Sequence, residues 1–303
     1  MKKYDIVILT EDRYDNIIPK DSNETNILLE DSLIQKSLEK LGLKVLRTSW
    51  SNPTFDWSTT KAALFSTTWD YFDRFPEFLT WLEETKEKTL FINPYETIKW
   101  NLDKHYLLDL KNAGINIPPT IFAEAGSKTS LTELFEKSGW EEAVLKPAIS
   151  GAGRHTYRLN KNNLKEHQEI FIGLLQEESM ILQEFQHNIA NKGEIAFMVM
   201  GDKFTHAILK KAKTGDFRVQ DDFGGTVEIY HPTKEEIDFA LTTVKKCGYK
   251  TTYARVDVFY DNNNQPAIGE LELIEPELWY RFKNSAADDL ANFVLNMDVM
   301  ARG

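Results

Sequence analysis

Hydrophobic residues in the first third of the chain fall into short runs that alternate with helical patterns. Strands are predicted over residues 5–10, 44–47, 62–66 and 89–92, and helices over 27–41 and 75–87. Such alternation favours an α/β layer built on a mainly parallel sheet. The first strand is followed by TEDRYDN and not by a glycine-rich turn, so the dinucleotide fingerprint is missing. This segment is therefore predicted to be Rossmann-like in outline and not to bind NAD.

A break at Asn93-Pro94 ends this pattern. A single helix is predicted over 95–113 and Pro118-Pro119 closes the segment, so we place the first domain at 1–116. A central lobe, 117–187, is predicted to contain strands at 120–123, 142–146, 156–159 and 180–185 and helices at 131–138 and 164–176. The last lobe, 188–303, is predicted to contain strands at 194–200, 203–211, 253–260 and 266–274, a helix at 234–247 and a final helix from about residue 284.

The strongest local signal is a predicted hairpin, YARVDVFYDNNNQPAIGELELIEPE. Alternate residues of a strand point to opposite faces, so Arg255 and Asp257 share one face, as do Glu270 and Glu272. A four-residue turn with residue 261 opposite residue 266 would place Asp257 opposite Glu270 and Arg255 opposite Glu272. The hairpin is therefore predicted to have one apolar face and one face with three carboxylates beside an arginine.

Three carboxylates this close repel one another unless a cation compensates them. Oxygen ligands suit Mg²⁺, which takes one or two protein carboxylates and completes its shell with water and phosphates. A solvated strand face with an Arg-Glu pair explains the hairpin alone about equally well. An EF-hand is excluded, because Pro266 stands where its sharp turn needs glycine.

A second candidate site is the segment AVLKPAISGAGR. Lys146 ends a buried-looking strand, which Pro147 cannot continue. The small residues Ser150, Gly151 and Gly153 would let backbone amides approach an anion, with Arg154 adding positive charge. The Gly-Lys-Ser/Thr ending of a Walker loop is missing, and a plain turn is the alternative.

Length and charge narrow the class of partner. A chain of 303 residues exceeds what one hydrophobic core organises, so lobes with a cleft between them are expected. The net charge of -11 and the lack of a Lys/Arg stripe argue against nucleic acid or an anionic membrane, which favours a small-molecule substrate. The single cysteine, Cys247, forms no internal disulfide, and no apolar run suits a signal peptide or a membrane helix. We expect a cytoplasmic protein, monomeric or homo-oligomeric.

The order of the motifs is more specific than any one of them. WNLDKHYL, the Lys146 loop, ILQEF, KKAKTGDFRVQDDFGG, ARVD and GELELIEPE together resemble the ATP-grasp superfamily, over roughly residues 90–282. The closest resemblance is to the ATP-binding domain of prokaryotic glutathione synthetases and their relatives, which include cyclo-ligases of antibiotic biosynthesis. It implies an α/β (α+β ATP-grasp) fold, in which a Rossmann-like pre-ATP-grasp domain precedes a two-lobed ATP-grasp domain.

The resemblance also implies the cofactors and the residues that hold them. ATP would bind with one or two Mg²⁺ ions, for which Mn²⁺ could substitute. The phosphates would contact Lys104, Lys146 and the Ser150–Arg154 loop, the adenine would contact the backbone of Gln183, Glu184 and Phe185, and the ribose would contact Glu194. The metal ligands would be Asp257, Glu270 and Glu272, the last where many relatives carry Asn. Near the γ-phosphate the resemblance places Lys210, Arg218 and Arg255, as cations that stabilise developing charge.

Candidate substrate residues lie in two other segments. FSTTWDYFDR follows a predicted strand and supplies Trp69 and Asp70, although packed aromatic residues in a loop explain it about as well. Arg281 follows the second carboxylate strand and could pair with a substrate carboxylate.

The function implied is ATP-dependent ligation of a small carboxylate, amino-acid-like or peptide-like, to an amine or thiol nucleophile. The γ-phosphate would pass to the carboxylate, and the nucleophile would attack the resulting acyl phosphate. Two alternatives remain open: an intramolecular cyclo-ligase, and a nucleotide-binding regulatory protein without turnover.

Overall fold

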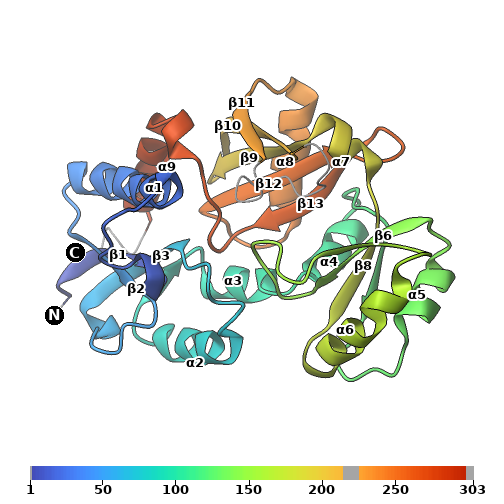
Figure 1. The fold of residues 1–303 in the computed structure, drawn as a ribbon. Helices are drawn as coiled ribbons and strands as arrows, with labels where there is room; N and C mark the ends of the chain where they lie inside the picture. The colour runs from blue at the N-terminus through green and yellow to red at the C-terminus, as the bar shows by residue number, and fades with distance from the viewer. Residues whose placement is uncertain (1, 214–224, 298–303) are drawn as a thin grey trace.

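The computed structural model describes residues 2–213 and 225–297, which fold around three β-sheets that follow one another along the chain (Figure 1). The first sheet has the order β2-β1-β3-β4, and its strands are parallel as expected. Its strands are β1 (Tyr4–Thr10), β2 (Val45–Ser49), β3 (Thr60–Thr67) and β4 (Leu90–Ile92).

Alternation along β1 explains why helices cover both faces of this sheet. Ile6 and Ile8 pack in the cluster that contains Ile34 of α1 (Ser22–Lys40). Val7 and Leu9 pack instead in a second cluster, with Phe78 and Leu82 of α2 (Phe75–Thr85). The helix α1 begins before the predicted position because Asp21 caps it, accepting a hydrogen bond from the Glu24 N–H at 2.8 Å.

The single helix predicted over 95–113 is wrong. The structure has α3 (Tyr95–Asn101) and α4 (Tyr106–Asn112), separated by a turn. In that turn the Lys104 N–H donates to the Ala148 carbonyl at 2.9 Å. No proline or glycine marks this break in WNLDKHYL, because its cause is a contact with a distant segment and not local sequence.

The second sheet has the order β5-β8-β6-β7, and all its neighbouring strands are antiparallel. Its strands are β5 (Thr120–Ala123), β6 (Glu142–Pro147), β7 (Tyr157–Asn160) and β8 (Met180–Glu184). The helices α5 (Leu131–Ser138) and α6 (Leu164–Glu177) pack on it around Phe135 and Phe171. A capping box formed by Ser130 and Glu133 starts α5 where the sequence predicts it.

The third sheet is antiparallel, with the order β11-β10-β9-β12-β13. Its strands are β9 (Glu194–Met200), β10 (Lys203–Lys211), β11 (Thr226–Tyr230), β12 (Tyr253–Tyr260) and β13 (Pro266–Glu272). The helices α4 and α8 (Lys234–Lys246) pack on its apolar face. Two short elements, α7 (His187–Lys192) and β11, were not predicted.

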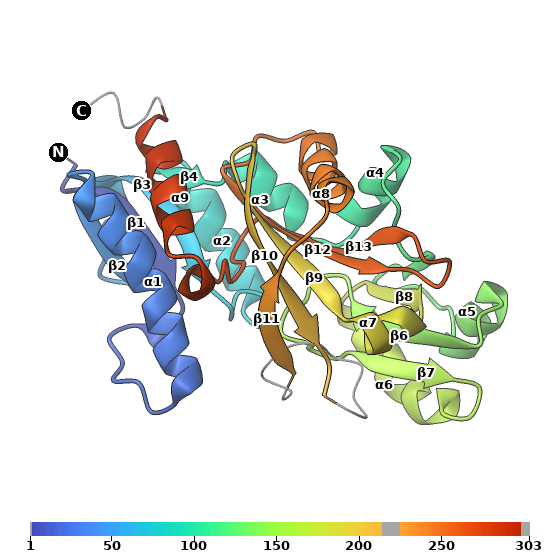
Figure 2. The same cartoon turned by 90° about the horizontal axis from the view of Figure 1, so that it is seen from above.

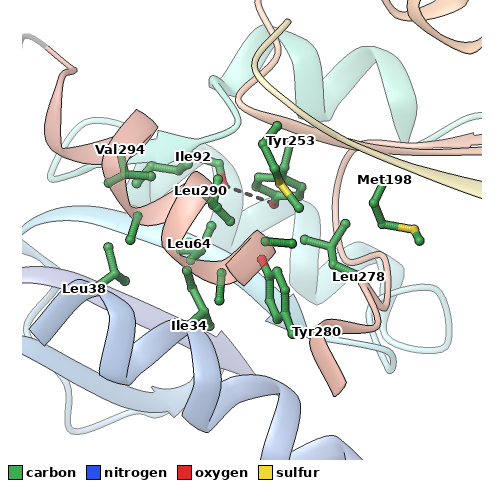
Figure 3. Close-up of a cluster of buried hydrophobic side chains, with 14 of the residues drawn as sticks. Ile34, Leu38, Leu64, Ile92, Met198, Tyr253, Leu278, Tyr280, Leu290 and Val294 are labelled. Carbon is green, nitrogen blue, oxygen red and sulfur yellow. Dashed lines mark hydrogen bonds between the residues drawn. The ribbon is translucent and has the colours of Figure 1, made fainter. Parts of the chain in front are cut away.

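The last described helix, α9 (Ser285–Leu295), returns to the first domain and packs beside α1 (Figure 2). The cluster between them joins both ends of the chain to the third sheet (Figure 3). The Tyr253 hydroxyl of this cluster donates to the Ile274 carbonyl at 2.6 Å and lies 3.1 Å from the Ile92 carbonyl. The three sheets lie within the three predicted domains, whose boundaries remain predictions. No helix in the described ranges is long and apolar enough to cross a membrane.

Candidate active site

A cavity of about 320 Å³ lies where the three sheets meet. Figures 1 and 2 both show β6 and β8 beside β12 and β13. Most of the predicted site residues line this cavity: Trp69, Lys104, Lys146, Ser150, Gly151, Gly153, Gln183, Glu184, Phe185, Glu194, Lys210, Arg255, Asp257, Glu270 and Glu272. Segments far apart in the sequence thus converge on one hollow.

The carboxylate hairpin has the register that strand parity predicts at its charged end. Asp257 stands opposite Glu270 and Arg255 opposite Glu272. The predicted turn is wrong: Tyr260, and not residue 261, pairs with Pro266, so the turn has one more residue than expected. A bulge at Gly269 of β13, which has no partner between the pairs of Asp257 and Val258, restores the register, and the two departures cancel.

The charged face of the hairpin is not a solvated strand surface. Asp257 is only 2% exposed, and Arg255, Glu270 and Glu272 line the same cavity. The opposite face, which includes Val256 and other apolar residues, is buried in the third sheet's core. Glu270 and Glu272 keep 31% and 25% of their side chains exposed, so the interpretation as a solvated face fails for Asp257, which Lys and Arg compensate in place of water.

Side chains from α3 and α4 hold β13 along the edge that has no partner strand in residues 2–213 and 225–297. The Asn101 side-chain amide donates to the Leu271 carbonyl at 2.8 Å, and its oxygen accepts from the Leu273 N–H at 2.8 Å. The Tyr106 hydroxyl accepts from the Leu271 N–H at 3.0 Å. These bonds replace a neighbouring strand, and they fix the residues between which Glu270 and Glu272 project.

Asp257 lies between two cations. Arg255 approaches it with Nε and Nη2, each 3.0 Å from a carboxylate oxygen, and Lys210 Nζ approaches at 2.8 Å. Lys210 also pairs with Glu194 at 2.5 Å. Although burial raises the pKa of Asp257, Arg255 and Lys210 lower it on balance, so the carboxylate stays ionised.

The two glutamates of β13 differ in charge balance. Glu270 pairs with Lys104 at 2.9 Å, and Lys104 together with Lys146 outweighs burial and lowers its pKa. Glu272 pairs with Arg255, yet burial and the charges of Asp257 and Glu270 raise its pKa to about 7. Glu272 is therefore the carboxyl of the three that holds a proton most readily near neutral pH.

The hairpin carboxylates fit a hard cation in chemistry, because all the donors are oxygens and all three residues line the cavity. In the described residues no three His, Cys, Asp or Glu side chains already surround a common point. Each of the three carboxylates is instead paired with Lys or Arg. A bound Mg²⁺ would compete with these cations for the oxygens.

Lys146 is a different kind of cation. It lines the cavity, and no acidic side chain pairs with it in the described part of the chain. Burial is the main cause that lowers its pKa, and nearby Lys104 adds to the shift, while the charge of Glu270 opposes it. A desolvated ammonium without a partner is an expected binding group for an anion.

The loop after Lys146 approaches the first domain closely. A Cβ at Gly151 would lie 2.5 Å from the Phe72 ring, so this position needs a residue without a side chain. Ala152 and Gly153 both have positive φ, at 49° and 69°. Consecutive residues in this conformation can turn their amides toward one anion.

The segment predicted to contact adenine is the end of β8 together with Phe185, and it lines the cavity. The Gln183 side chain donates to Thr120 Oγ1 at 3.0 Å, and the Glu184 and Phe185 N–H groups donate to the Pro119 and Glu142 carbonyls. These bonds attach the segment firmly to the second sheet. The structure places Glu194 at the start of β9, paired with Lys210.

Three predicted site residues are absent from the lining of the cavity, and a fourth is outside the described residues. Arg154 makes a two-point contact with Glu178, at 2.8 and 2.9 Å, and does not line the cavity. Asp70 accepts from the Trp50 indole at 2.7 Å, pairs with Arg74 and does not line the cavity. Arg281 pairs with Glu277 and is also absent from the lining, whereas Arg218 lies outside the described residues.

Sequence reasoning missed several lining residues, chiefly Phe72, Tyr106, Glu275 and Glu277. The signal for the last two was present in GELELIEPE, where acidic residues continue beyond the strand. Parity could not be extended to them, because β13 ends at Glu272 and Pro276 changes the course of the chain.

Comparison with known proteins identifies two matching regions. Residues 6–93 match the family described as D-cycloserine synthetase DcsG, N-terminal domain. Residues 103–273, more than half of the chain, match the RimK-like ATP-grasp domain.

Individual relatives match over different lengths. The cycloserine biosynthesis protein DcsG of Streptomyces lavendulae is 27% identical over 255 residues, which cover 78% of this chain and 83% of that protein. A probable alpha-L-glutamate ligase of Vibrio atlanticus is 30% identical over 185 residues, which cover 60% of this chain and 59% of that ligase. The crystal structure of D-cycloserine synthetase DcsG superposes with a TM-score of 0.83 at 23% identity, covering 95% of this chain and 98% of that one.

Proposed function

Because this chain belongs to the RimK-like ATP-grasp family, we propose that its cavity activates a small carboxylate with Mg-ATP and joins it to an amine. The protein is an ATP-dependent ligase that forms a C–N bond, as its ATP-grasp relatives are. The family thus favours ligation over a regulatory role, and an amine over a thiol.

One observation carries the proposal of where this happens. The unpaired ammonium of Lys146 and the hairpin carboxylates Asp257, Glu270 and Glu272 line one cavity. Anionic phosphates need the first kind of group, and a divalent cation needs the second. We assign the phosphates to Lys104, Lys146 and the loop from Ser150 to Gly153, and the metal to the three carboxylates.

The remaining assignments follow the walls of the cavity. We place the adenine against Gln183, Glu184 and Phe185, and assign Lys210 and Arg255 to the transferring phosphoryl group. Both cations are already held by Asp257, so they are positioned before substrate arrives. When bound, Mg²⁺ supplies charge neutralisation to the phosphates.

The reaction has two substitution steps, and in each step one bond forms and one bond breaks. A substrate carboxylate oxygen attacks the γ-phosphorus and the bond to ADP breaks, giving an acyl phosphate. The amine nitrogen then attacks the acyl carbon, and the C–O bond to phosphate breaks as the amide forms. The protein's part is positioning and electrostatic stabilisation, because no covalent bond to the chain is required.

The test is a screen for ADP release from Mg-ATP with pairs of carboxylates and amines, starting from D- and L-amino acids. We expect ADP release that depends on a carboxylate, and a product whose mass equals both substrates less one water. Loss of water from a single substrate would indicate ring closure in place of joining two molecules. Nucleotide binding with no carboxylate-dependent ADP release in any pair would contradict ligation.

A further inference from the structure

The acidic residues of the cavity wall differ in whether a cation balances them. Asp257, Glu270 and Glu272 are paired as described above, and Glu277 pairs with Arg281. Glu275 also lines the cavity, but it meets no Lys or Arg side chain among residues 2–213 and 225–297. A carboxyl of this kind has room for a cation that the protein does not supply.

The backbone around Glu275 is fixed from two sides. The Trp69 indole N–H donates to the Glu275 carbonyl at 2.9 Å, and the Tyr253 hydroxyl donates to the preceding carbonyl, that of Ile274, at 2.6 Å. Arg255 reaches the Glu277 carbonyl at 3.4 Å. The side chain of Glu275 is therefore presented from a held segment and not from a free loop.

A second polar group without a partner lies in the same part of the wall. Tyr71 is 5% exposed and lines the cavity, yet its hydroxyl has no hydrogen-bond partner in the described chain. Tyr71 and Glu275 line the same cavity, and Trp69, two residues before Tyr71, donates to the Glu275 carbonyl at 2.9 Å. Burial raises the pKa of Tyr71, and the charge of Glu275 adds to the shift. The Tyr71 hydroxyl and the Glu275 carboxyl therefore line the cavity without a partner from the described chain, which leaves both available to a ligand.

We propose that Glu275, with the Tyr71 hydroxyl and the Trp69 ring, forms the subsite for the nucleophile, and that the nucleophile is a primary amine that enters as its ammonium ion. The proposal rests on the ligase function proposed above and names its second substrate class. The carboxylate balances the ammonium charge, and the aromatic rings favour a cation beside them.

The subsite also accounts for the protons of the ligation step. A primary ammonium has three N–H protons, and its nitrogen must lose one before it can attack. Glu275 accepts that proton, the amine attacks the acyl carbon, and the bond from this carbon to the phosphate oxygen breaks. The second proton leaves with phosphate as hydrogen phosphate, and the third stays on the amide nitrogen.

The environment of Glu275 agrees with a proton acceptor. Burial raises the pKa of Glu275 well above its usual value, and Glu272 adds to the shift while Lys104 opposes it. A bound ammonium ion would lower this pKa and favour the ionised carboxylate, which, being desolvated, then takes a proton from the amine more readily than an exposed one.

The test compares two nucleophiles on the same acyl phosphate. Hydroxylamine is mostly uncharged at neutral pH and traps acyl phosphates as hydroxamates, so it needs no ammonium subsite. With the carboxylate found in the ADP screen, we would measure hydroxamate formation and amide formation in the wild type, in Glu275→Gln and in Glu275→Asp. Glu136→Gln, an exposed carboxyl on α5, is the matched control.

We expect Glu275→Gln to keep hydroxamate formation within about twofold while kcat/KM for the amine falls roughly 10- to 100-fold. Glu275→Asp should recover part of the loss. Equal loss of both products, or no loss of amide formation, would overturn the subsite. Failure to find any ammonium-bearing nucleophile, while hydroxamate still forms, would overturn it too.

Two further results keep the test decisive. Tyr71→Phe removes one hydroxyl without changing the ring, and we expect a smaller rise in KM for the amine with hydroxamate formation unchanged. This variant decides the question if Glu275→Gln does not fold, because an unchanged KM would then count against the subsite. A wild-type protein that forms neither ADP nor hydroxamate would instead contradict the ligase function.

Discussion

At the scale of single residues, the cavity separates its ionisable groups by what compensates them. Asp257 and Glu270 have cations within 3 Å and lowered pKa values, whereas Glu272 has a pKa raised to about 7. Lys146 and Glu275 lack partners among the described residues. The paired carboxylates are held in place by their cations. The charged side chains of Lys146 and Glu275, which lack such a partner, can exchange bound water for a ligand.

Lys146→Met should therefore change stability and binding in opposite directions. Removing a desolvated ammonium without a partner should leave the melting temperature of the nucleotide-free protein unchanged or higher. Affinity for Mg-ADP should fall roughly 10- to 100-fold, because a charge-assisted contact is lost. Calorimetric titration and thermal unfolding measure the two effects, and Lys137→Met on the exposed face of α5 is the control. Unchanged nucleotide affinity would remove Lys146 from the phosphate site.

His206 gives a pH dependence with a defined sign. Burial lowers the pKa of His206 from 6.5 to about 4, while its ring contacts Thr205 and the Trp279 carbonyl. A depressed folded-state pKa contributes stability that is present above pH 6.5 and is lost as the pH falls toward 4. The wild type should therefore lose more unfolding free energy than His206→Gln when the pH is lowered from 7 to 4.5. We expect the difference between the two losses to be roughly 2 to 3 kcal/mol.

Urea titrations at several pH values check this difference. The exposed His231 provides the control, since His231→Gln should follow the wild-type curve. Parallel curves for His206→Gln and the wild type would show that His206 does not titrate as a buried neutral ring.

At the scale of elements, the edge of β13 depends on side chains for its hydrogen bonds. Asn101→Ala would leave the Leu271 carbonyl and the Leu273 N–H without their partners. Two unsatisfied buried groups should cost roughly 2 to 5 kcal/mol of unfolding free energy. Asn112→Ala, at the exposed end of α4, should cost little.

Hydrogen exchange locates the effect. In Asn101→Ala the Leu273 amide should exchange faster, with a smaller change in the second sheet. Loss of stability without faster exchange along β13 would assign Asn101 a different role.

The hairpin shows how much of an element's structure could be predicted from the sequence. Its two faces and its charged pairs could be predicted, because side-chain direction in a strand depends only on parity. The length of the turn could not be predicted. The loop is one residue longer than expected, and the bulge at Gly269 offsets this extra residue, so the register at the charged end is unchanged. Local signals also located β9, β10, β12 and α5 with their observed bounds.

Other features depend on contacts that no local pattern records. The break between α3 and α4 follows from the hydrogen bond between the Lys104 N–H and the Ala148 carbonyl. The Arg154 guanidinium does not line the cavity, because it donates to the Glu178 carboxylate. Glu275 and Tyr71 come to line one cavity only when the first domain meets the third sheet. The direction of side chains along one strand could thus be predicted, whereas these particular contacts between distant segments could not.

At the scale of the whole molecule, Glu30 connects the first domain to the segment after β13. Its carboxyl oxygens accept from the Leu278 and Tyr280 N–H groups at 2.8 and 2.9 Å. Burial raises the pKa of Glu30 well above its usual value, and the charge of Glu277 adds to the shift. This one side chain therefore satisfies two buried amides across the domain interface.

Glu30→Ala should weaken the interface more than Glu30→Gln, because glutamine keeps one acceptor oxygen. Each amide left unsatisfied should cost roughly 1 to 3 kcal/mol. Limited proteolysis should cut residues 275–284 faster in Glu30→Ala, in proportion to the loss of stability. Glu39→Ala, on the exposed side of the same helix, is the control, and equal cleavage in all variants would contradict this role.

The capped edge of β13 has a consequence for solubility. An edge strand with free N–H and C=O groups is a template on which a second chain can add a strand, and such additions lead to aggregates. Asn101 and Tyr106 occupy the groups of Leu271 and Leu273 that would otherwise be offered. Asn101 and Tyr106 thus also keep β13 from pairing with a strand of another molecule. When these hydrogen bonds are lost, turbidity on mild heating should be the first sign.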